Sequence, residues 1–189
     1  MQTGSQQRTF FNPVWILPIA VATIAAGLVA FLGATVTDLG PWYQGLAKPS
    51  WTPPDGLVPI VWTIVYALIT VSGITAWRAA PTGGEALNVI SLFAANAFLN
   101  ITWSLLFFRF QRPDWAFTEV VFLWLSILAI MIYCGRFSRK AALLLVPYLA
   151  WVSIAAALNW NVIQLNGPFG CASHQARAAP RAGPCPLDP

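Results

Sequence analysis

Hydrophobic residues along the chain gather in five long runs that are separated by polar segments. A helix needs about 20 consecutive apolar residues to cross the hydrocarbon core of a bilayer. The connections between the later runs are short, so consecutive helices must lie antiparallel to one another. The pattern predicts an all-α membrane protein, a bundle of five transmembrane helices at residues 14–36, 57–77, 87–108, 115–134 and 141–163.

The segments that flank these runs predict the limits of the membrane domain. Residues 1–13 form an N-terminal segment, and the membrane domain covers residues 14–166. The first run is longer than the roughly 7–15 residues of a signal-peptide core, which favours a retained helix. Beyond it, Gly, Ala, Pro and scattered polar residues predict a disordered tail at residues 167–189. Pro147, inside the fifth run, is expected to bend its helix.

The composition agrees with an integral, multi-pass membrane location. Of the 189 residues, 58% are hydrophobic and 8% are charged, whereas a soluble domain carries about 25% charged residues. The bases flank the apolar runs, so the net charge of +4 indicates membrane helix ends and no nucleic-acid partner. Their distribution favours an N-terminus on the cytoplasmic side. The three cysteines form no metal-binding or disulfide pattern.

Ionisable residues are almost absent from the predicted membrane interior. Glu119 lies in the fourth run, close enough to the helix start that we expect it to reach the membrane interface. No chain of acidic or histidine residues crosses the bilayer, which argues against an ion-coupled transporter. No Ser-His-Asp, Cys-His or haem-ligating pair occurs in the runs, so the sequence predicts no metal site and no acid–base catalytic residue.

Polar residues inside the apolar runs identify the faces that point into the bundle. Asn96, Asn100 and Asn159 carry amides that lipid cannot satisfy, so we expect these side chains to point inward. Helical spacing places Trp103 and Trp151 on the same inward faces. Interhelical hydrogen bonds with an interfacial aromatic belt would explain these residues, and so would an aromatic cavity with a few amides. Such a cavity suits a flat, apolar ligand with a polar edge.

Small residues follow one side of the first run. Alanines recur at every fourth position from residue 22 to residue 34, which lets another helix approach closely. Two partners fit this stripe: another helix of the same chain, or the same stripe of a second copy in a dimer.

A long connection follows the first run, at residues 37–56. It contains Trp42, Tyr43 and Trp51 among several prolines, so we expect a stiff aromatic segment and not a flexible linker. Rigid loops on a helical scaffold often cover a binding site, and aromatic loops also anchor proteins at a membrane interface. The pattern alone supports both hypotheses equally.

Several segments resemble the TspO/translocator protein family, whose members are also called tryptophan-rich sensory proteins or peripheral-type benzodiazepine receptors. The resemblance covers roughly residues 10–166. The segments that carry it are Trp42-Tyr43, Lys48-Pro49-Ser50-Trp51-Thr52-Pro53-Pro54, Trp62-Thr63 with Tyr66, Asn100 with Trp103, Pro147-Tyr148 with Trp151, and Asn159-Trp160.

The resemblance implies a membrane receptor or carrier for porphyrin-type tetrapyrroles such as protoporphyrin or haem, acting in tetrapyrrole and stress regulation. It implies a bundle that is commonly a homodimer, surrounded by membrane lipid, with a ligand pocket under the first connection and no required cofactor. The residues at matching positions, expected to form the lid and lining of that pocket, are Trp42, Tyr43, Trp51, Trp62, Tyr66, Asn100, Trp103, Trp151, Ala155 and Asn159.

The resemblance also leaves other functions open. Light- and oxygen-dependent degradation of porphyrin needs no protein base, and Trp42 and Trp151 would take part in it. A lipid- or sterol-binding regulatory scaffold is a further alternative. Animal members bind cholesterol through a motif in the fifth helix that ends in Tyr and Arg. The corresponding residues 158–164 contain neither a Tyr nor a base, which argues against cholesterol binding there. Within the family, the resemblance therefore implies a bacterial-type member in a bacterial cell membrane.

Overall fold

The computed structural model describes residues 23–24, 27–29, 31, 35 and 37–169 of the chain. The predicted N-terminal segment, most of the first predicted span with all four alanines of its stripe, and residues 170–189 of the predicted tail lie outside the described residues. The described part contains four helices that are long and apolar enough to cross a membrane, at Leu57–Ala79, Gly83–Arg109, Pro113–Gly135 and Arg139–Asn166. An all-α membrane architecture is therefore confirmed, and the described residues contain no strand.

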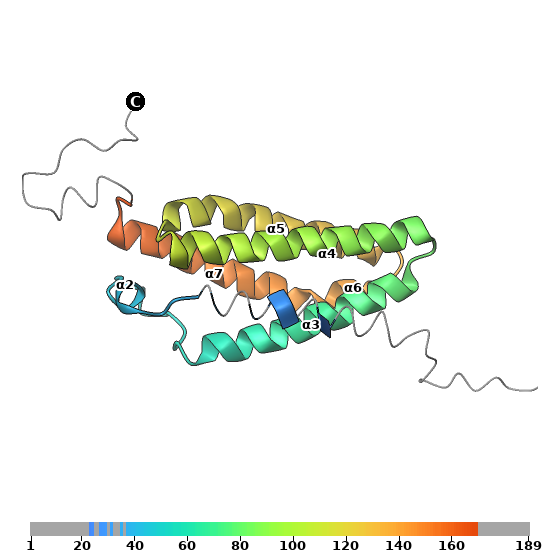
Figure 1. Ribbon diagram of the computed structural model, residues 1–189, viewed down its shortest axis with the longest axis horizontal. Helices are drawn as coiled ribbons and strands as arrows, with labels where there is room; N and C mark the ends of the chain where they lie inside the picture. Colours follow the sequence, from blue (N-terminus) through green and yellow to red (C-terminus); the bar gives the residue numbers. More distant parts are fainter. Residues whose placement is uncertain (1–22, 25–26, 30, 32–34, 36, 170–189) are drawn as a thin grey trace, which may run out of the picture.

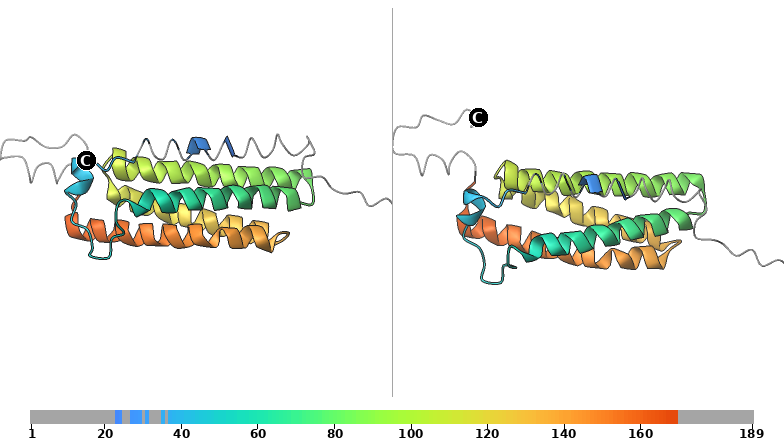
Figure 2. Two further views of the ribbon diagram at one scale, coloured as in Figure 1. Left: turned by 90° about the horizontal axis from the view of Figure 1, so that it is seen from below. Right: turned by 60° about the horizontal axis from the view of Figure 1, so that its bottom comes forward.

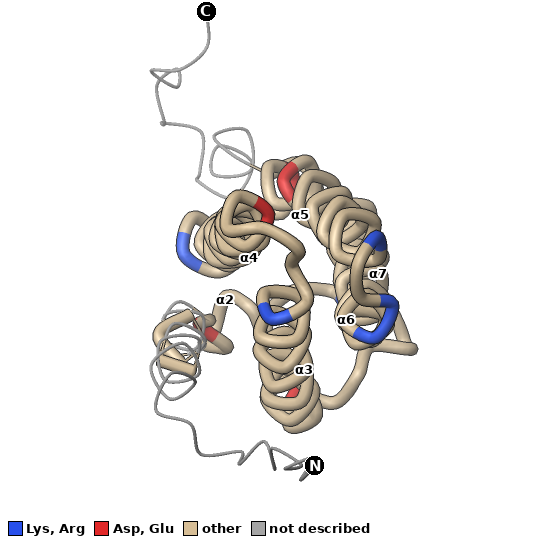
Figure 3. The backbone as a smooth tube through the Cα atoms, turned by 90° about the vertical axis from the view of Figure 1, so that its right-hand side faces the viewer, with Lys and Arg blue, Asp and Glu red and all other residues tan. Residues whose placement is uncertain are grey.

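Each of these helices coincides with a predicted span to within a few residues. The elements are α3 (Leu57–Ala79), α4 (Gly83–Ser104) with the π-helical turn η1 (Leu105–Arg109), α5 (Pro113–Gly135), α6 (Arg139–Leu144) and α7 (Val146–Asn166). The long helices run along one another, with α5 in extensive contact with both α4 and α7 (Figure 1). Viewed end-on, α3, α4, α5 and α7 surround a common centre (Figure 3).

The connection at residues 37–56, which we call the lid, lies across the end of the bundle at which α7 ends (Figure 2). It contains α2 (Pro41–Gln44), a single helical turn with a proline at its start. Two residues after α2 the chain turns again, and it then runs through three closely spaced prolines to the start of α3. The lid is thus built from restricted backbone, as its proline content predicted.

Helix α4 begins four residues before the predicted start, because its first turn is polar. The Thr82 hydroxyl accepts a hydrogen bond from the backbone N–H of Glu85 at 3.2 Å. This is the capping interaction expected of a Thr followed three residues later by Glu. A search for apolar residues alone therefore places the start of this helix too late.

The last predicted span is divided at Leu145, between α6 and α7. Pro147 has no backbone N–H, so it cannot bond to the carbonyl of Leu143, and the predicted bend lies at this point. The break has a consequence for packing. Helix α3 has more contacts with the short α6 than with the much longer α7. Beyond the break, α3 and α7 therefore leave room between them.

The polarity of the bundle is that of a membrane protein. Its buried polar residues include Asn96, Asn100 and Asn159, which are 4%, 2% and 1% exposed, so the predicted inward orientation is confirmed. Large apolar residues such as Ile64, Phe98 and Phe122 are more than half exposed and cover the outer surface. Hydrocarbon rather than water is the solvent that suits this surface.

The expectation for Glu119 is wrong. Its side chain is only 8% exposed, and both carboxylate oxygens are buried without a hydrogen-bond partner in the described structure. It shares the inward face of α5 with Ala116 and Leu123, which recur at helical spacing. Depth along the helix therefore does not bring this carboxyl group to the interface, because the group points into the bundle.

Candidate functional site

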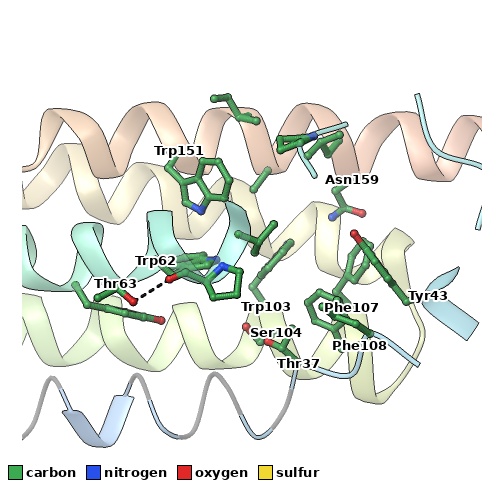
Figure 4. A pocket seen from close by; sticks show the side chains of 18 of the residues that line it. Thr37, Tyr43, Trp62, Thr63, Trp103, Ser104, Phe107, Phe108, Trp151 and Asn159 are labelled. Atoms are coloured by element: carbon green, nitrogen blue, oxygen red, sulfur yellow. Dashed lines mark hydrogen bonds between the residues drawn. The ribbon is translucent and has the colours of Figure 1, made fainter. Parts of the chain in front are cut away.

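A cavity of about 710 Å³ lies under the lid, between α3, the end of α4 and α7 (Figure 4). Its volume is within the roughly 300–1,000 Å³ that is typical of small-molecule sites. Residues Thr23 and Gly27 of the first predicted span also line it. The cavity occupies the space that opens beyond the break at Leu145, where α3 and α7 separate. We call it the aromatic cavity.

Tryptophans from three different helices form the walls: Trp62 of α3, Trp103 of α4 and Trp151 of α7. The rings of Trp62 and Trp151 are perpendicular, with centroids 6.4 Å apart. Trp62 also stacks on Tyr66 at 5.2 Å, one helical turn further along α3. Perpendicular and offset-stacked arrangements are the favoured geometries of aromatic pairs, so these contacts hold the wall rings in fixed orientations.

The indole nitrogens of Trp103 and Trp151 are buried, and no described group accepts a hydrogen bond from either. Figure 4 shows the Trp151 nitrogen on the edge of the ring that is directed towards Trp62. An unpaired buried donor costs free energy, on the order of 1–3 kcal/mol. A ligand atom that accepts a hydrogen bond from these groups would remove that cost.

A chain of hydrogen bonds behind the wall connects four helices. The Tyr66 hydroxyl donates to the Asn100 amide oxygen at 2.9 Å, and the Asn100 nitrogen donates to the Tyr148 hydroxyl at 3.4 Å. Tyr148 in turn donates to Asn96 at 3.1 Å, and Asn96 donates to the Ser126 hydroxyl at 2.7 Å. The Tyr66 hydroxyl thus donates its proton to a group behind the wall. The network therefore fixes Tyr66 in the wall and leaves its hydroxyl oxygen as an acceptor.

Asn159 of α7 lines the cavity, while its side-chain amide connects α7 to α5. In the orientation that satisfies both groups, the amide nitrogen donates to the Pro113 carbonyl and the oxygen accepts from the Phe117 N–H, each at 3.0 Å. These bonds join α7 to the backbone at the start of α5. The role we find for this amide is structural.

The π-helical turn η1 brings further aromatic rings to the cavity. Its wider winding ends in a bond from the Phe110 N–H to the Leu105 carbonyl, and Gln111 follows with a positive φ of 54°. Phe107 and Phe108 line the cavity from this turn. Phe107 stacks on Trp103 at 5.5 Å. Helical spacing from Asn100 and Trp103 places Phe107 on the same inward face, whereas the sequence predicts neither the π-turn nor the position of Phe108.

The lid is attached to the end of α7 by a pair of hydrogen bonds. The side-chain oxygen of Asn166 accepts from the Ala47 N–H, and its nitrogen donates to the Ala47 carbonyl, both at 2.8 Å. Trp42 packs against Phe107 with centroids 6.0 Å apart, and Phe169 contacts the same cluster. No local pattern predicts the Asn166 contact, because it joins residues 119 positions apart.

Tyr43 and Lys48 form the part of the lid nearest the cavity. The Lys48 Nζ lies 3.6 Å from the centroid of the Tyr43 ring, a close cation–π contact. The Tyr43 hydroxyl donates to Asp55 at 3.4 Å. Burial, followed by the charge of Asp55 and this hydrogen bond, raises the pKa of Tyr43 to about 12, so the phenol is neutral at physiological pH.

The structure places the predicted site residues in three positions. Seven of them line the aromatic cavity: Tyr43, Trp62, Tyr66, Trp103, Trp151, Ala155 and Asn159. Asn100 lies one layer behind the wall, where its amide is used by Tyr66 and Tyr148. Trp42 packs on Phe107 outside the lining, and Trp51 is 48% exposed on the lid. Lys48 lines the cavity and was not among the predicted residues.

Among the described residues, no group of His, Cys, Asp or Glu side chains is arranged to hold a metal ion. The described lining contains no His, Cys or Met, and its charged member is Lys48. Glu119 does not line the cavity. The site therefore offers aromatic faces, a few hydrogen-bonding groups and one cation.

Comparisons with known proteins agree on one family. A model of the TspO/MBR family matches residues 19–165. The chain is 42% identical to the tryptophan-rich protein TspO of Chlorobaculum tepidum over 159 residues, which cover 80% of this chain and 97% of that protein. It is 33% identical to protein CrtK of Rhodobacter capsulatus, with 78% and 91% covered. It is 32% identical to the human translocator protein, with 79% and 90% covered.

Proposed function

This chain belongs to the TspO/MBR family of multi-pass integral membrane proteins, and from that membership we propose that its aromatic cavity binds porphyrin-type tetrapyrroles. In this proposal the protein is a membrane receptor or carrier for protoporphyrin or haem in tetrapyrrole and stress regulation. The observation that supports it most is the convergence of Trp62, Trp103 and Trp151 from three helices on one cavity of about 710 Å³.

The chemistry of the walls suits a large, flat and apolar ring system. Aromatic faces stack favourably on other aromatic faces, and a ligand that covers an indole ring removes a large apolar surface from solvent. The unpaired indole N–H groups of Trp103 and Trp151 supply donors for polar atoms at the edge of such a ring. Sites of this type combine apolar walls with a small number of placed polar groups.

The residues of the cavity do not fit axial ligation of haem iron. Its described lining has no His, Cys or Met, and the hydroxyls of its tyrosines donate to Asp55 and Asn100. We therefore propose that the macrocycle is recognised and that the iron is not. Metal-free protoporphyrin and haem are expected to bind with similar affinity.

Photo-oxidative degradation of the bound porphyrin is a second candidate function. Trp151 lines the cavity, so its ring could be oxidised next to an illuminated porphyrin, whereas Trp42 packs on Phe107 outside the lining. If this activity exists, the structure supports a part for Trp151 and a weaker part for Trp42. Aerobic illumination that yields a bilin-like absorbance, absent in the dark and without oxygen, would establish it.

Titration of the purified protein with protoporphyrin, followed by tryptophan fluorescence, tests the binding proposal. We expect saturable quenching in the wild type and a loss of affinity of at least about tenfold in the Trp62→Ala/Trp151→Ala variant, since each lost stacking ring contributes about 1 kcal/mol. Trp160→Ala is the matched control, because Trp160 is on the same helix as Trp151 but 48% exposed and outside the cavity.

Circular dichroism of the variants separates a binding defect from misfolding. Equal affinities of the double variant and the Trp160→Ala control, with both proteins folded, would contradict the proposed site. The absence of saturable binding to the wild type would favour a structural or lipid-binding scaffold instead.

A further inference from the structure

We propose that the aromatic cavity selects amphipathic anions, and that Lys48 anchors the ligand's carboxylate at the mouth of the cavity beneath the lid. This inference rests on the proposed function, which it narrows to ligands that carry an acidic group at the edge of an apolar ring system. It makes Lys48 a specificity-determining residue.

Lys48 is the one charged side chain among the described residues that line the cavity. Its side chain is partly buried. Bringing an ammonium group into an apolar pocket costs free energy unless an opposite charge or an aromatic face compensates for it. The Tyr43 ring at 3.6 Å compensates for it on one side only.

No described carboxylate forms an ion pair with Lys48. The lid contains two acids, and both accept other hydrogen bonds. Asp38 accepts from the Gly40 N–H at 2.8 Å, and Asp55 accepts from the Tyr43 hydroxyl at 3.4 Å and from the Gln44 side chain at 3.2 Å. Tyr43 thus contacts Lys48 with its ring face and Asp55 with its hydroxyl. The ammonium group keeps its three donors for a ligand.

The backbone holds Lys48 at this position. The preceding residue, Ala47, is fixed by both of its polar backbone groups to the Asn166 amide. The following residue is Pro49, which restricts the backbone of Lys48 to extended conformations and itself lines the cavity. A cation held in this way is pre-organised for a partner, which lowers the entropic cost of binding.

The remaining polar groups of the cavity point to the same class of ligand. The indole N–H groups of Trp103 and Trp151 are donors without an acceptor among the described residues. The cavity therefore offers a cation and two unpaired donors. A peripheral carboxylate on an apolar ring system would pair with Lys48, whereas the uncharged ester would leave Lys48 unpaired.

The test compares protoporphyrin IX with its dimethyl ester, which has the same ring system without the carboxylates. The full chain is placed in phosphatidylcholine nanodiscs, and binding is followed by tryptophan fluorescence with empty nanodiscs as the blank. The variants are Lys48→Met, which removes the charge, and Lys48→Arg, which keeps it. Lys140→Met is the matched control, because Lys140 is the other lysine of the chain and does not line the cavity.

We expect the wild type to bind the diacid more tightly than the diester, and Lys48→Met to weaken diacid binding about tenfold, the size of one charge-assisted contact. Diester binding should stay unchanged, Lys48→Arg should bind the diacid like the wild type, and Lys140→Met should have no effect. The preference for the diacid should also fall as salt concentration rises.

Three outcomes would count against these statements. Equal binding of diacid and diester by the wild type, unchanged in Lys48→Met, overturns the anchoring role and leaves the proposed function standing. Equal losses for both compounds in Lys48→Met would assign Lys48 to lid structure and also overturn the anchor. Binding of neither compound to the wild type overturns the proposed function itself.

Discussion

The two ends of this bundle differ in the size of the side chains that point inward. At one end, Ser72, Ala76, Cys134 and Ala141 are all 0% exposed, and we call this the closed end. Their short side chains let α3 approach α6 so closely that the Ser72 hydroxyl donates to the Ala141 carbonyl at 2.8 Å. At the other end, the open end, tryptophans of α3, α4 and α7 surround the aromatic cavity.

The boundary between the two ends lies near the break at Leu145. The hydrogen-bonded chain from Tyr66 to Ser126 crosses the bundle close to it, through Tyr148 in the first turn of α7. Buried polar groups that are fully paired specify one arrangement of the helices. The network thus holds the helices in position beside the cavity, so that the empty volume of the open end does not disturb the packing of the closed end. Close packing at one end and the cavity at the other therefore depend on different residues, and α3 contributes to both ends.

The largest effect on stability is expected from a bulky residue at the closed end. Ala141→Leu adds three carbon atoms to a side chain of α6 that is fully buried, on a helix that packs against α3 and α5. Overpacking of this kind typically costs about 1–3 kcal/mol. Unfolding of the purified protein in a mixed detergent titration should show this loss of unfolding free energy. A midpoint equal to that of the wild type would mean that the closed end is not closely packed.

Much of this division was visible in the sequence, for physical reasons. The spans appeared because apolar runs must be long enough to cross a bilayer. Asn96, Asn100 and Trp103 were assigned to an inward face because helical spacing relates them and lipid cannot satisfy an amide. The same rule does not predict that Asn100 lies behind the wall, since a helical face does not reveal which neighbouring residue forms hydrogen bonds with each amide.

Other features depend on contacts between distant residues, which periodicity does not record. The bond between Ala47 and Asn166 joins the lid to the end of the last helix, and no local pattern predicts it. Lys48 stands in a motif of the lid, but its position over Tyr43 depends on how the lid folds back. Glu119 was assigned by its depth along α5, although its spacing from Ala116 and Leu123 marks the inward face.

An intermediate effect is expected where the lid is attached to the open end. Asn166→Ala removes both hydrogen bonds to Ala47, which should cost about 1 kcal/mol and free the lid locally. Hydrogen exchange should become faster for lid amides, including that of Ala47, while the amides of α5 keep their protection. Asn161→Ala is the control, because Asn161 is on the same helix and donates only to Ala157 within it. Equal lid exchange in both variants would show that Asn166 does not hold the lid.

The smallest effect on stability is expected when the same change, alanine to leucine, is made at the open end. Ala155→Leu extends a side chain of α7 into the aromatic cavity, where free volume receives it. The free energy of unfolding should therefore change by less than about 0.5 kcal/mol, as for substitutions that disturb no packed contact. Porphyrin affinity should fall about tenfold, because the ligand loses part of the space it needs.

The matched control, Ala157→Leu on the exposed face of α7, should change neither the unfolding free energy nor the porphyrin affinity. If Ala155→Leu instead destabilised the protein as much as Ala141→Leu, the cavity would be packed in solution, and the contrast between the two ends would not hold.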